Sequence, residues 1–412
     1  MFPLPTSSLS VLNRAQLPVP AGSARSFLLI LLLIVLLVGC ATPDIGGPAA
    51  PNGDSSAGTL TLPSGRSLPI YPEQLAYTGA ASYRWPDGRT YDGNWLNGKP
   101  DGMGSEQRPD GERYHGTWVA GERGGHGELH SADGNHYVGD FAAGVRSGQG
   151  SQRSESGLYS GSWQNDVPNG FGEFFGNDGS SYSGQWRNGQ RDGVGRYEDG
   201  QGNSYDGDWS GDSPEGFGTM INADGSRYEG QRTRNMRNGY GRLDAGGFSY
   251  EGTWLAGKRH GYGRSTSPDG NSYLGEWQNG NRHGLGRASN ADGSYHEGEW
   301  QHDRSIGPGT RVDASGIQIS GIWNDDLVPS GLLILPSGRT YAGGLIKRDR
   351  MIAPALIRWL DRSATEGDPH ASLFLGRIYS EFADPAPDLP RARRAYLDAA
   401  DAGIAEGAYR AA

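Results

Sequence analysis

Residues 91–104 read YDGNWLNGKPDGMG, and residues 114–127 repeat the pattern as YHGTWVAGERGGHG. Both stretches begin with Tyr-x-Gly-x-Trp and end with Gly-x-Gly. The glycine of the first motif returns along the chain at steps of 22 or 23 residues. It occupies Gly93, Gly116, Gly139, Gly161, Gly184, Gly207, Gly230, Gly252, Gly275, Gly298, Gly321 and Gly343. Recurrence at one spacing predicts an array in which each copy is one small structural unit.

Each unit is expected to be a β-hairpin. Side chains in a strand alternate between faces, so the Tyr, Gly and Trp of the first motif share one face. The Gly-x-Gly strand leaves bare backbone over which rings of the adjacent unit can lie. Pairs such as Asp87-Gly88 supply the positive φ that a tight turn demands. We expect the rings to form the core, the alternative being an exposed face that stacks on sugars or a partner peptide. The rings concerned include Tyr91, Trp95, Tyr114, Trp118, Tyr182, Trp186, Tyr205, Trp209, Tyr273 and Trp277.

The composition excludes several classes of protein. The 412 residues include 69 Gly, but glycine does not recur at every third position as collagen requires. The 11 Trp and 20 Tyr argue against disorder. A formal net charge of -10 argues against nucleic-acid binding. The single cysteine excludes an internal disulfide framework.

The repeated unit resembles the MORN repeat, whose signature is the Tyr-x-Gly-x-Trp strand, the Gly-x-Gly strand and a 23-residue period. The resemblance covers residues 88 to about 345. It implies a mostly β fold, an elongated single-layer antiparallel sheet of about twelve stacked hairpins followed by a short helical segment. We assign the array to residues 76–350, with residues 65–88 as a degenerate cap.

The N-terminus has the pattern of an export signal. Residues 27–38 read FLLILLLIVLLV, which is too short for a bilayer-spanning helix and typical of a signal peptide. Cys40 follows directly and resembles the lipid-modified cysteine of a bacterial lipobox. We therefore predict a signal peptide over residues 1–39, lipidation of Cys40 and a flexible tether over residues 40–75. An uncleaved signal anchor is the alternative.

The lipobox resemblance implies a cell-envelope location, with the array in the periplasm. Ala41 after the cysteine favours the outer membrane, by resemblance to enterobacterial lipoproteins. The expected partners are the membrane, through the anchor, and an envelope protein or a second copy of the chain.

Residues 351–412 change to helical spacing, with Leu375 and Tyr379 four apart. The segment resembles a Sel1-like repeat, a relative of the tetratricopeptide repeat, and a generic two-helix tail is the alternative. A single unit cannot bury its apolar face alone, so we expect it to cap the last hairpins or to contribute to dimerisation. The matching residues are Gly367, Asp368, Ala371, Leu375, Gly376, Tyr379, Ala395, Ala399, Ala400 and Gly403.

A row of arginines stands two residues before many of the Gly-x-Gly motifs. Guanidinium groups bind carboxylates and phosphates in bidentate fashion, so an aligned row could hold anionic lipid or cell-wall glycan. The resemblance to MORN repeats also implies binding of anionic lipids. The alternative is that the arginines form a solvated, charged strand edge that blocks aggregation. This arginine row comprises Arg123, Arg146, Arg191, Arg237, Arg259 and Arg282.

The sequence contains no catalytic motif that we recognise: no nucleophile elbow, P-loop, dinucleotide fingerprint or His-Glu-x-x-His. His126 and His130 are four apart, but outside a helix this spacing does not converge on a metal, and no metal site or cofactor is expected. The predicted function is a non-catalytic, lipid-anchored envelope scaffold. A binder of anionic lipid or glycan is the alternative, and an enzyme is a remote one.

Overall fold

The computed structural model describes residues 58–325, 327–346, 352–381 and 387–411. The predicted signal peptide, Cys40 and residues 40–57 of the predicted tether lie outside these ranges. The described residues form one antiparallel sheet of 26 strands and five short helices, so the predicted fold class is confirmed.

The strands are β1 (Thr59–Thr61), β2 (Ser67–Pro69), β3 (Gly79–Arg84), β4 (Thr90–Leu96), β5 (Lys99–Gln107), β6 (Arg113–Val119), β7 (Glu122–His130), β8 (His136–Ala142), β9 (Val145–Arg153), β10 (Gly157–Gln164), β11 (Val167–Gly176), β12 (Ser181–Arg187), β13 (Gln190–Glu198), β14 (Ser204–Ser210), β15 (Ser213–Ile221), β16 (Arg227–Thr233), β17 (Met236–Ala245), β18 (Phe248–Leu255), β19 (Lys258–Thr266), β20 (Ser272–Gln278), β21 (Asn281–Ser289), β22 (Tyr295–Gln301), β23 (Arg304–Val312), β24 (Gln318–Trp323), β25 (Ser330–Ile334) and β26 (Thr340–Gly344). The helices are α1 (Pro72–Leu75), α2 (Pro354–Thr365), α3 (Pro369–Glu381), α4 (Leu389–Asp401) and α5 (Ala405–Ala411).

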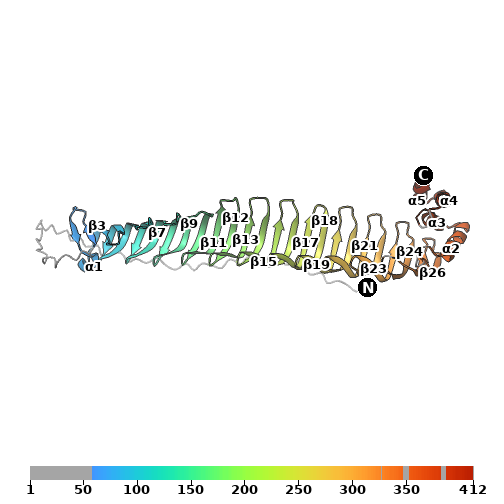
Figure 1. The fold of residues 1–412 in the computed structure, drawn as a ribbon, viewed down its shortest axis with the longest axis horizontal. Helices are drawn as coiled ribbons and strands as arrows, with labels where there is room; N and C mark the ends of the chain where they lie inside the picture. Colours follow the sequence, from blue (N-terminus) through green and yellow to red (C-terminus); the bar gives the residue numbers. More distant parts are fainter. Residues whose placement is uncertain (1–57, 326, 347–351, 382–386, 412) are drawn as a thin grey trace, which may run out of the picture. The chain divides into compact units, whose positions relative to one another are not determined.

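From β3 onward each strand pairs with the strands before and after it in the chain, as in β3–β4, β4–β5 and β5–β6. β1 pairs with both β2 and β3 and so closes the N-terminal end of the sheet. Figure 1 shows these hairpins succeeding one another in a single row. The sheet is therefore built almost entirely from local pairings.

Two kinds of turn alternate along the array. A two-residue turn joins the two motif strands of one repeat, as at Asn97-Gly98, where both residues have positive φ. This geometry matches the right-handed twist of the flanking strands. The predicted Asp-Gly turns form the longer connections: the Gly111 amide donates to the Arg108 carbonyl (3.1 Å), and the Glu112 amide donates to Asp110 Oδ1 (3.0 Å).

The N-terminal end begins earlier than the sequence predicts. Residues 58–75, assigned to the flexible tether and from residue 65 also to the degenerate cap, contain β1, β2 and α1. Leu60 is fully buried and belongs to the same apolar cluster as Tyr83 of β3. The tether prediction is therefore wrong for this stretch, because its short apolar residues cover the first hairpin.

The helices at the other end cover the last hairpins. Leu356 of α2 and Leu375 of α3 share one apolar core with Trp323 and Leu333 of the sheet. Arg377 of α3 forms an ion pair with Asp313, in the turn after β23. The apolar face that a lone helical unit cannot bury by itself thus packs on β24 and β25. The assignment of these helices to a Sel1-like repeat remains a prediction.

Candidate functional site

The aromatic residues of the repeats form a ladder on one face of the sheet. Tyr91 meets Trp95 of its own strand edge to face (ring centroids 5.1 Å apart) and Trp118 of the next repeat likewise (5.2 Å). This alternation continues through Tyr114, Phe141 and Tyr137. Edge-to-face contacts of this kind contribute about 0.5–1.5 kcal/mol each beyond area burial. The aromatic ladder therefore links most repeats to the next.

The glycines of the two motifs make room for these rings. A Cβ added to Gly104 would lie 2.1 Å from the hydroxyl oxygen of Tyr91, so the ring lies directly on the Gly-x-Gly backbone. The Tyr91 hydroxyl donates to the Asn94 carbonyl (2.9 Å), and Trp118 Nε1 donates to the Gly104 carbonyl (3.3 Å). The prediction that rings of the adjacent unit cover Gly-x-Gly is thus incomplete, because the tyrosine comes from the same hairpin.

The ten aromatic residues singled out in the sequence all lie in this ladder. Trp186 is half-buried and the other nine are buried. Burial raises the pKa of Tyr114 and of Tyr182 to about 12, because the charged phenolate is poorly solvated there. The nine buried rings therefore have no open face on which to stack a sugar.

Two positions break the ladder with other chemistry. Arg232 takes the place of a tryptophan, is only 8% exposed, and places its guanidinium over Tyr205 and Tyr228 (5.7 and 5.9 Å). Its Nε atom has no hydrogen-bond partner among the described residues. His296 takes the place of a tyrosine and lies between Trp300 and Trp323.

The arginine row lies along the rim of the same face, where three of its members bind the turn of the next hairpin. Arg146 stacks on Trp163 (4.6 Å), while its Nε lies 3.0 Å from Asp166 Oδ1 and its terminal nitrogen donates to the Asp166 carbonyl (2.8 Å). Arg191 and Arg282 repeat this arrangement with the aspartate of the following turn. Each of these three guanidinium groups already has an acceptor within the chain.

The remaining members of the arginine row differ in their partners. Arg123 forms ion pairs with Glu106 (2.9 Å) and Glu112 (2.5 Å). Arg259 donates to the Gly280 carbonyl (2.7 Å), and Arg237 lies over Trp254 (4.3 Å) with no carboxylate partner among the described residues. Desolvation lowers the pKa of both Arg237 and Arg259.

The opposite face of the sheet carries a second row that the sequence analysis did not foresee. Within each Gly-x-Gly motif the second glycine faces the aromatic side of the sheet, and the middle residue faces the opposite side. In six consecutive repeats this middle residue is apolar and more than half exposed. We call this set the outer row: Phe171, Val194, Phe217, Tyr240, Tyr262 and Leu285. Near its end a shallow hollow is lined by Tyr262, Leu274, Leu285, Pro308 and Ile322.

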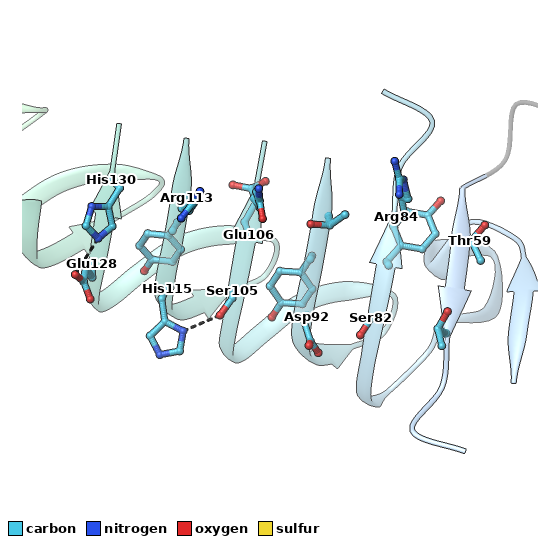
Figure 2. A pocket seen from close by; sticks show the side chains of 16 residues that line it. Thr59, Ser82, Arg84, Asp92, Ser105, Glu106, Arg113, His115, Glu128 and His130 are labelled. Carbon is cyan, nitrogen blue, oxygen red and sulfur yellow. Dashed lines mark hydrogen bonds and ion pairs between the residues drawn. The ribbon is translucent and has the colours of Figure 1, made fainter. Parts of the chain in front are cut away.

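His126 and His130, four residues apart in the sequence, have different partners in the structure. His126 lies beside Asp140 (3.2 Å), whereas His130 lies beside Glu128 (3.0 Å) and His136 (rings 4.2 Å apart). The prediction that no His and acidic side chains converge is therefore wrong for Glu128, His130 and His136, whose donor atoms lie within 4.8 Å of one another. Figure 2 shows Glu128 and His130 side by side at the end of the pocket that they line.

The stacked hairpins carry the aromatic ladder on one face and exposed side chains on the other, which defines a repeat protein with an extended interaction surface. The chain belongs to the MORN-repeat family, because the family profile matches ten segments that together cover more than half of its residues. These segments are residues 91–113, 114–136, 137–158, 159–181, 182–204, 205–227, 228–245, 250–272, 273–295 and 296–318. MORN repeats are generally non-catalytic, and the family supports a repeat-based protein-interaction scaffold.

Comparison with solved structures adds only weak likenesses. The TCP10 domain of CPAP from Danio rerio (E1021V mutant) is 9% identical with a TM-score of 0.13, over 64% of this chain and 97% of that one. The SAS-4 TCP domain of Drosophila melanogaster, in complex with a proline-rich motif of Ana2, is 8% identical with a TM-score of 0.14, over 58% and 87%. A streptogramin B lyase is 11% identical with a TM-score of 0.12, over 65% and 82%. TM-scores this low do not establish a shared fold.

No curated protein matches the sequence. Within the described ranges, none of the helices has the length and apolar character needed to cross a membrane.

Proposed function

We propose that this chain is a non-catalytic scaffold of the cell envelope that assembles with a second copy of itself through the outer row and is held at the membrane by a lipid on Cys40. The observation that carries the proposal is the run of six exposed apolar side chains on consecutive repeats. Soluble monomers rarely expose large apolar patches, and large exposed patches mark interaction surfaces.

The period of the outer row favours a second copy as the partner. Each repeat contributes two strands about 4.8 Å apart, so successive members stand about 10 Å apart and the row spans roughly 50 Å. A globular partner would have to reproduce this period over the whole distance. Another copy of the chain has it already, and a twofold arrangement would bring each row onto its counterpart.

The charges beside the outer row are mixed in sign. Arg242 lies 3.9 Å from Glu251, and Arg287 lies 3.6 Å from Glu297. All four of these side chains are about half exposed. A surface of one sign would repel its own copy, whereas alternating charges allow opposite signs to meet across a twofold interface.

Sedimentation velocity of the full-length chain in mild detergent tests self-association. We expect a wild-type dimer, and a monomer for the triple variant Phe217→Ser, Tyr262→Ser and Leu285→Ser. The matched control is Val119→Ser, Met236→Ser and Leu255→Ser, which removes three apolar side chains of similar exposure beside the two-residue turns and should stay dimeric. A monomeric wild type, or a dimer that survives in the row variant, would overturn self-association through this surface.

The lipid anchor is tested separately by intact mass and membrane fractionation in a Gram-negative host. Support for the anchor comes from the apolar run at residues 27–38 and from the single cysteine that follows it. We expect a mature chain that begins at Cys40 and carries acyl mass, and we expect Cys40→Ser to lose both features. An uncleaved wild-type chain that stays in the membrane would establish a signal anchor and overturn lipidation.

A second candidate function, binding of anionic lipid or glycan, is favoured by one pair of side chains. Arg232 and Arg237 lie opposite each other on β16 and β17, and neither has a carboxylate partner among the described residues. Two desolvated guanidinium groups without a counter-ion would gain from an added anion. Phosphatidylglycerol vesicles and a soluble anionic glycan are the two probes.

Arg237→Gln should weaken sedimentation with vesicles, or binding of the glycan, while Arg282→Gln should not. The control loses a guanidinium that is already paired with Asp303. Equal effects of the two variants, or no effect of either, would overturn the candidate function.

A further inference from the structure

We propose that Glu128, His130 and His136 form a binding site for a divalent transition-metal ion, Zn²⁺ in particular. Glu128 Oε1 lies 3.0 Å from His130 Nε2 and 2.7 Å from His136 Nε2. One donor atom of each side chain lies within 4.8 Å of the other two. This inference is independent of the outer row and of the lipid anchor.

The hairpin places the three side chains together through its register. Glu128 and His130 are two residues apart on β7, so they project from the same face of the sheet. His136 begins β8 and lies directly opposite His130 in the strand pairing. The turn between them is closed by hydrogen bonds from the Ser131 amide to the Asn135 carbonyl (2.8 Å) and from the Asn135 amide to Asp133 Oδ1 (3.1 Å).

The orientation of the two imidazole rings brings both Nε2 atoms to the same point. The rings of His130 and His136 stack almost in parallel, with centroids 4.2 Å apart and planes 5° apart. Both Nε2 atoms meet one carboxylate oxygen of Glu128. A divalent ion at that meeting point would take the place of the hydrogen-bond protons that now join the nitrogens to the oxygen.

The donor set suits zinc rather than calcium or magnesium. Two imidazoles and one carboxylate are ligands typical of Zn²⁺ and related ions, whereas calcium and magnesium take oxygen ligands. Zinc binds such ligands at about 2.0–2.2 Å, which places donor atoms about 3.3 Å apart and demands only small side-chain rotations from the present arrangement.

The surroundings leave room for further ligands. The side chains of His130, Glu128 and His136 are 54%, 44% and 37% exposed, so water can complete the coordination. On the neighbouring strand β6, His115 lies opposite Glu128, but its Nδ1 is engaged with Ser105 Oγ (2.7 Å), as Figure 2 shows. The site therefore has three protein ligands from a single hairpin.

Isothermal titration of the metal-free, full-length chain with Zn²⁺ tests the site, followed by metal analysis after dialysis. We expect one zinc per wild-type chain and at least about a ten-fold weaker Kd for His136→Gln. His126→Gln is the matched control, because His126 lies on the same strand and face and, among the described acidic groups, contacts only Asp140. This control should bind zinc as the wild type does.

Copper supplies a second readout that does not depend on affinity. With Cu²⁺ as the probe, electron paramagnetic resonance should show two nitrogen ligands in the wild type and one in His130→Gln. A wild-type chain that retains no zinc, a His136→Gln variant with unchanged zinc binding, or equal weakening by His126→Gln would overturn the assignment. In each case the three side chains would form a hydrogen-bonded cluster only.

Discussion

Substitution of Gly104 by alanine should disrupt the aromatic ladder without changing any ring. The added Cβ would lie 2.1 Å from the Tyr91 hydroxyl oxygen and 2.4 Å from the adjacent ring carbon. The backbone φ of Gly104 is not positive, so conformational strain of the alanine itself is small. The tyrosine ring must therefore move away from the Gly-x-Gly strand.

The expected cost follows from what the displaced ring loses. Tyr91 is 1% exposed, and moving its ring into water forfeits about 1.5–3 kcal/mol of apolar burial. The hydrogen bond from its hydroxyl to Asn94 contributes about another 1 kcal/mol. We predict that Gly104→Ala lowers local stability by about 2–4 kcal/mol.

A suitable control separates the clash from the effect of any added side chain. Gly111 has φ +95° and no atom within 4 Å of an added Cβ. Gly111→Ala should therefore cost only the left-handed backbone strain, about 1–2 kcal/mol.

Hydrogen exchange of the β4 and β5 amides is the appropriate assay, because repeat arrays open locally rather than as one two-state unit. In a Tyr91→Ala background the ring is gone, and Gly104→Ala should cost almost nothing further. A cost of Gly104→Ala no larger than that of Gly111→Ala, or a full cost that persists without the ring, would show that the clash with Tyr91 is not the cause.

Three further changes test the interior of the array. Glu106→Gln should cost about 3 kcal/mol of local stability by hydrogen exchange, because this 3% exposed carboxylate pairs with three arginines; a loss under about 1 kcal/mol would contradict this. Arg232→Trp should stabilise the array by about 1–3 kcal/mol in thermal unfolding, since it replaces a desolvated charge with a ring; destabilisation would count against the ladder. Burial raises the pKa of Tyr114 and Tyr137 from 10 to about 12, which favours the neutral phenol in the folded state. Their contribution to stability should be complete below pH 10 and lost as the pH rises through about 12, with phenolate absorbance appearing together with unfolding; ionisation of the folded chain at pH 10 would refute it.

The sequence predicts the fold well because the determining contacts are local. The Tyr-x-Gly-x-Trp strand and the Gly-x-Gly strand pair across a turn of two residues, so register and facing both follow from one repeat. Asn97-Gly98 is a common signal for a two-residue turn, although the tight turns were predicted only at the Asp-Gly pairs. Ala120, with φ +52°, gives no such signal and adopts the conformation because the hairpin imposes it.

The ends of the sheet were harder to foresee because their contacts are not local. Leu60 is buried in a cluster with Tyr83, and nothing in the composition of residues 58–64 distinguishes such a cover from a tether. At the other end, Arg377 meets Asp313 across 64 positions of sequence. Pairings at this distance depend on how the helices pack and leave no periodic trace.

The arginine row shows which part of a site can be read from spacing. Its alignment followed from the period, but its partners lie one turn further on. Asp166 stands 20 residues after Arg146, and Asp212 stands 21 after Arg191. This second spacing recurs at Arg282 but not at the other three members of the row, so three of the ion pairs could have been predicted from the sequence.

One face of the sheet forms the core and the other is free to carry functional side chains. On the aromatic face Tyr91, Trp95 and their counterparts are fixed by packing, and most of the arginine row is engaged with acceptors in the chain. On the opposite face the middle residue of Gly-x-Gly makes no such contribution, so it can vary freely. It is His126 in an early repeat and Phe171, Phe217 or Leu285 in later ones.

This variation separates the outer face into two parts. The earlier hairpins carry Glu128, His130 and His136, a set suited to a metal ion, and the later ones carry the apolar side chains suited to another copy of the chain. Because neither set contributes to the ladder, substitutions in either should leave the array folded. Loss of zinc binding in His136→Gln together with loss of the dimer would mean that the two parts are coupled, whereas loss of zinc binding alone would show that one sheet carries two independent sites.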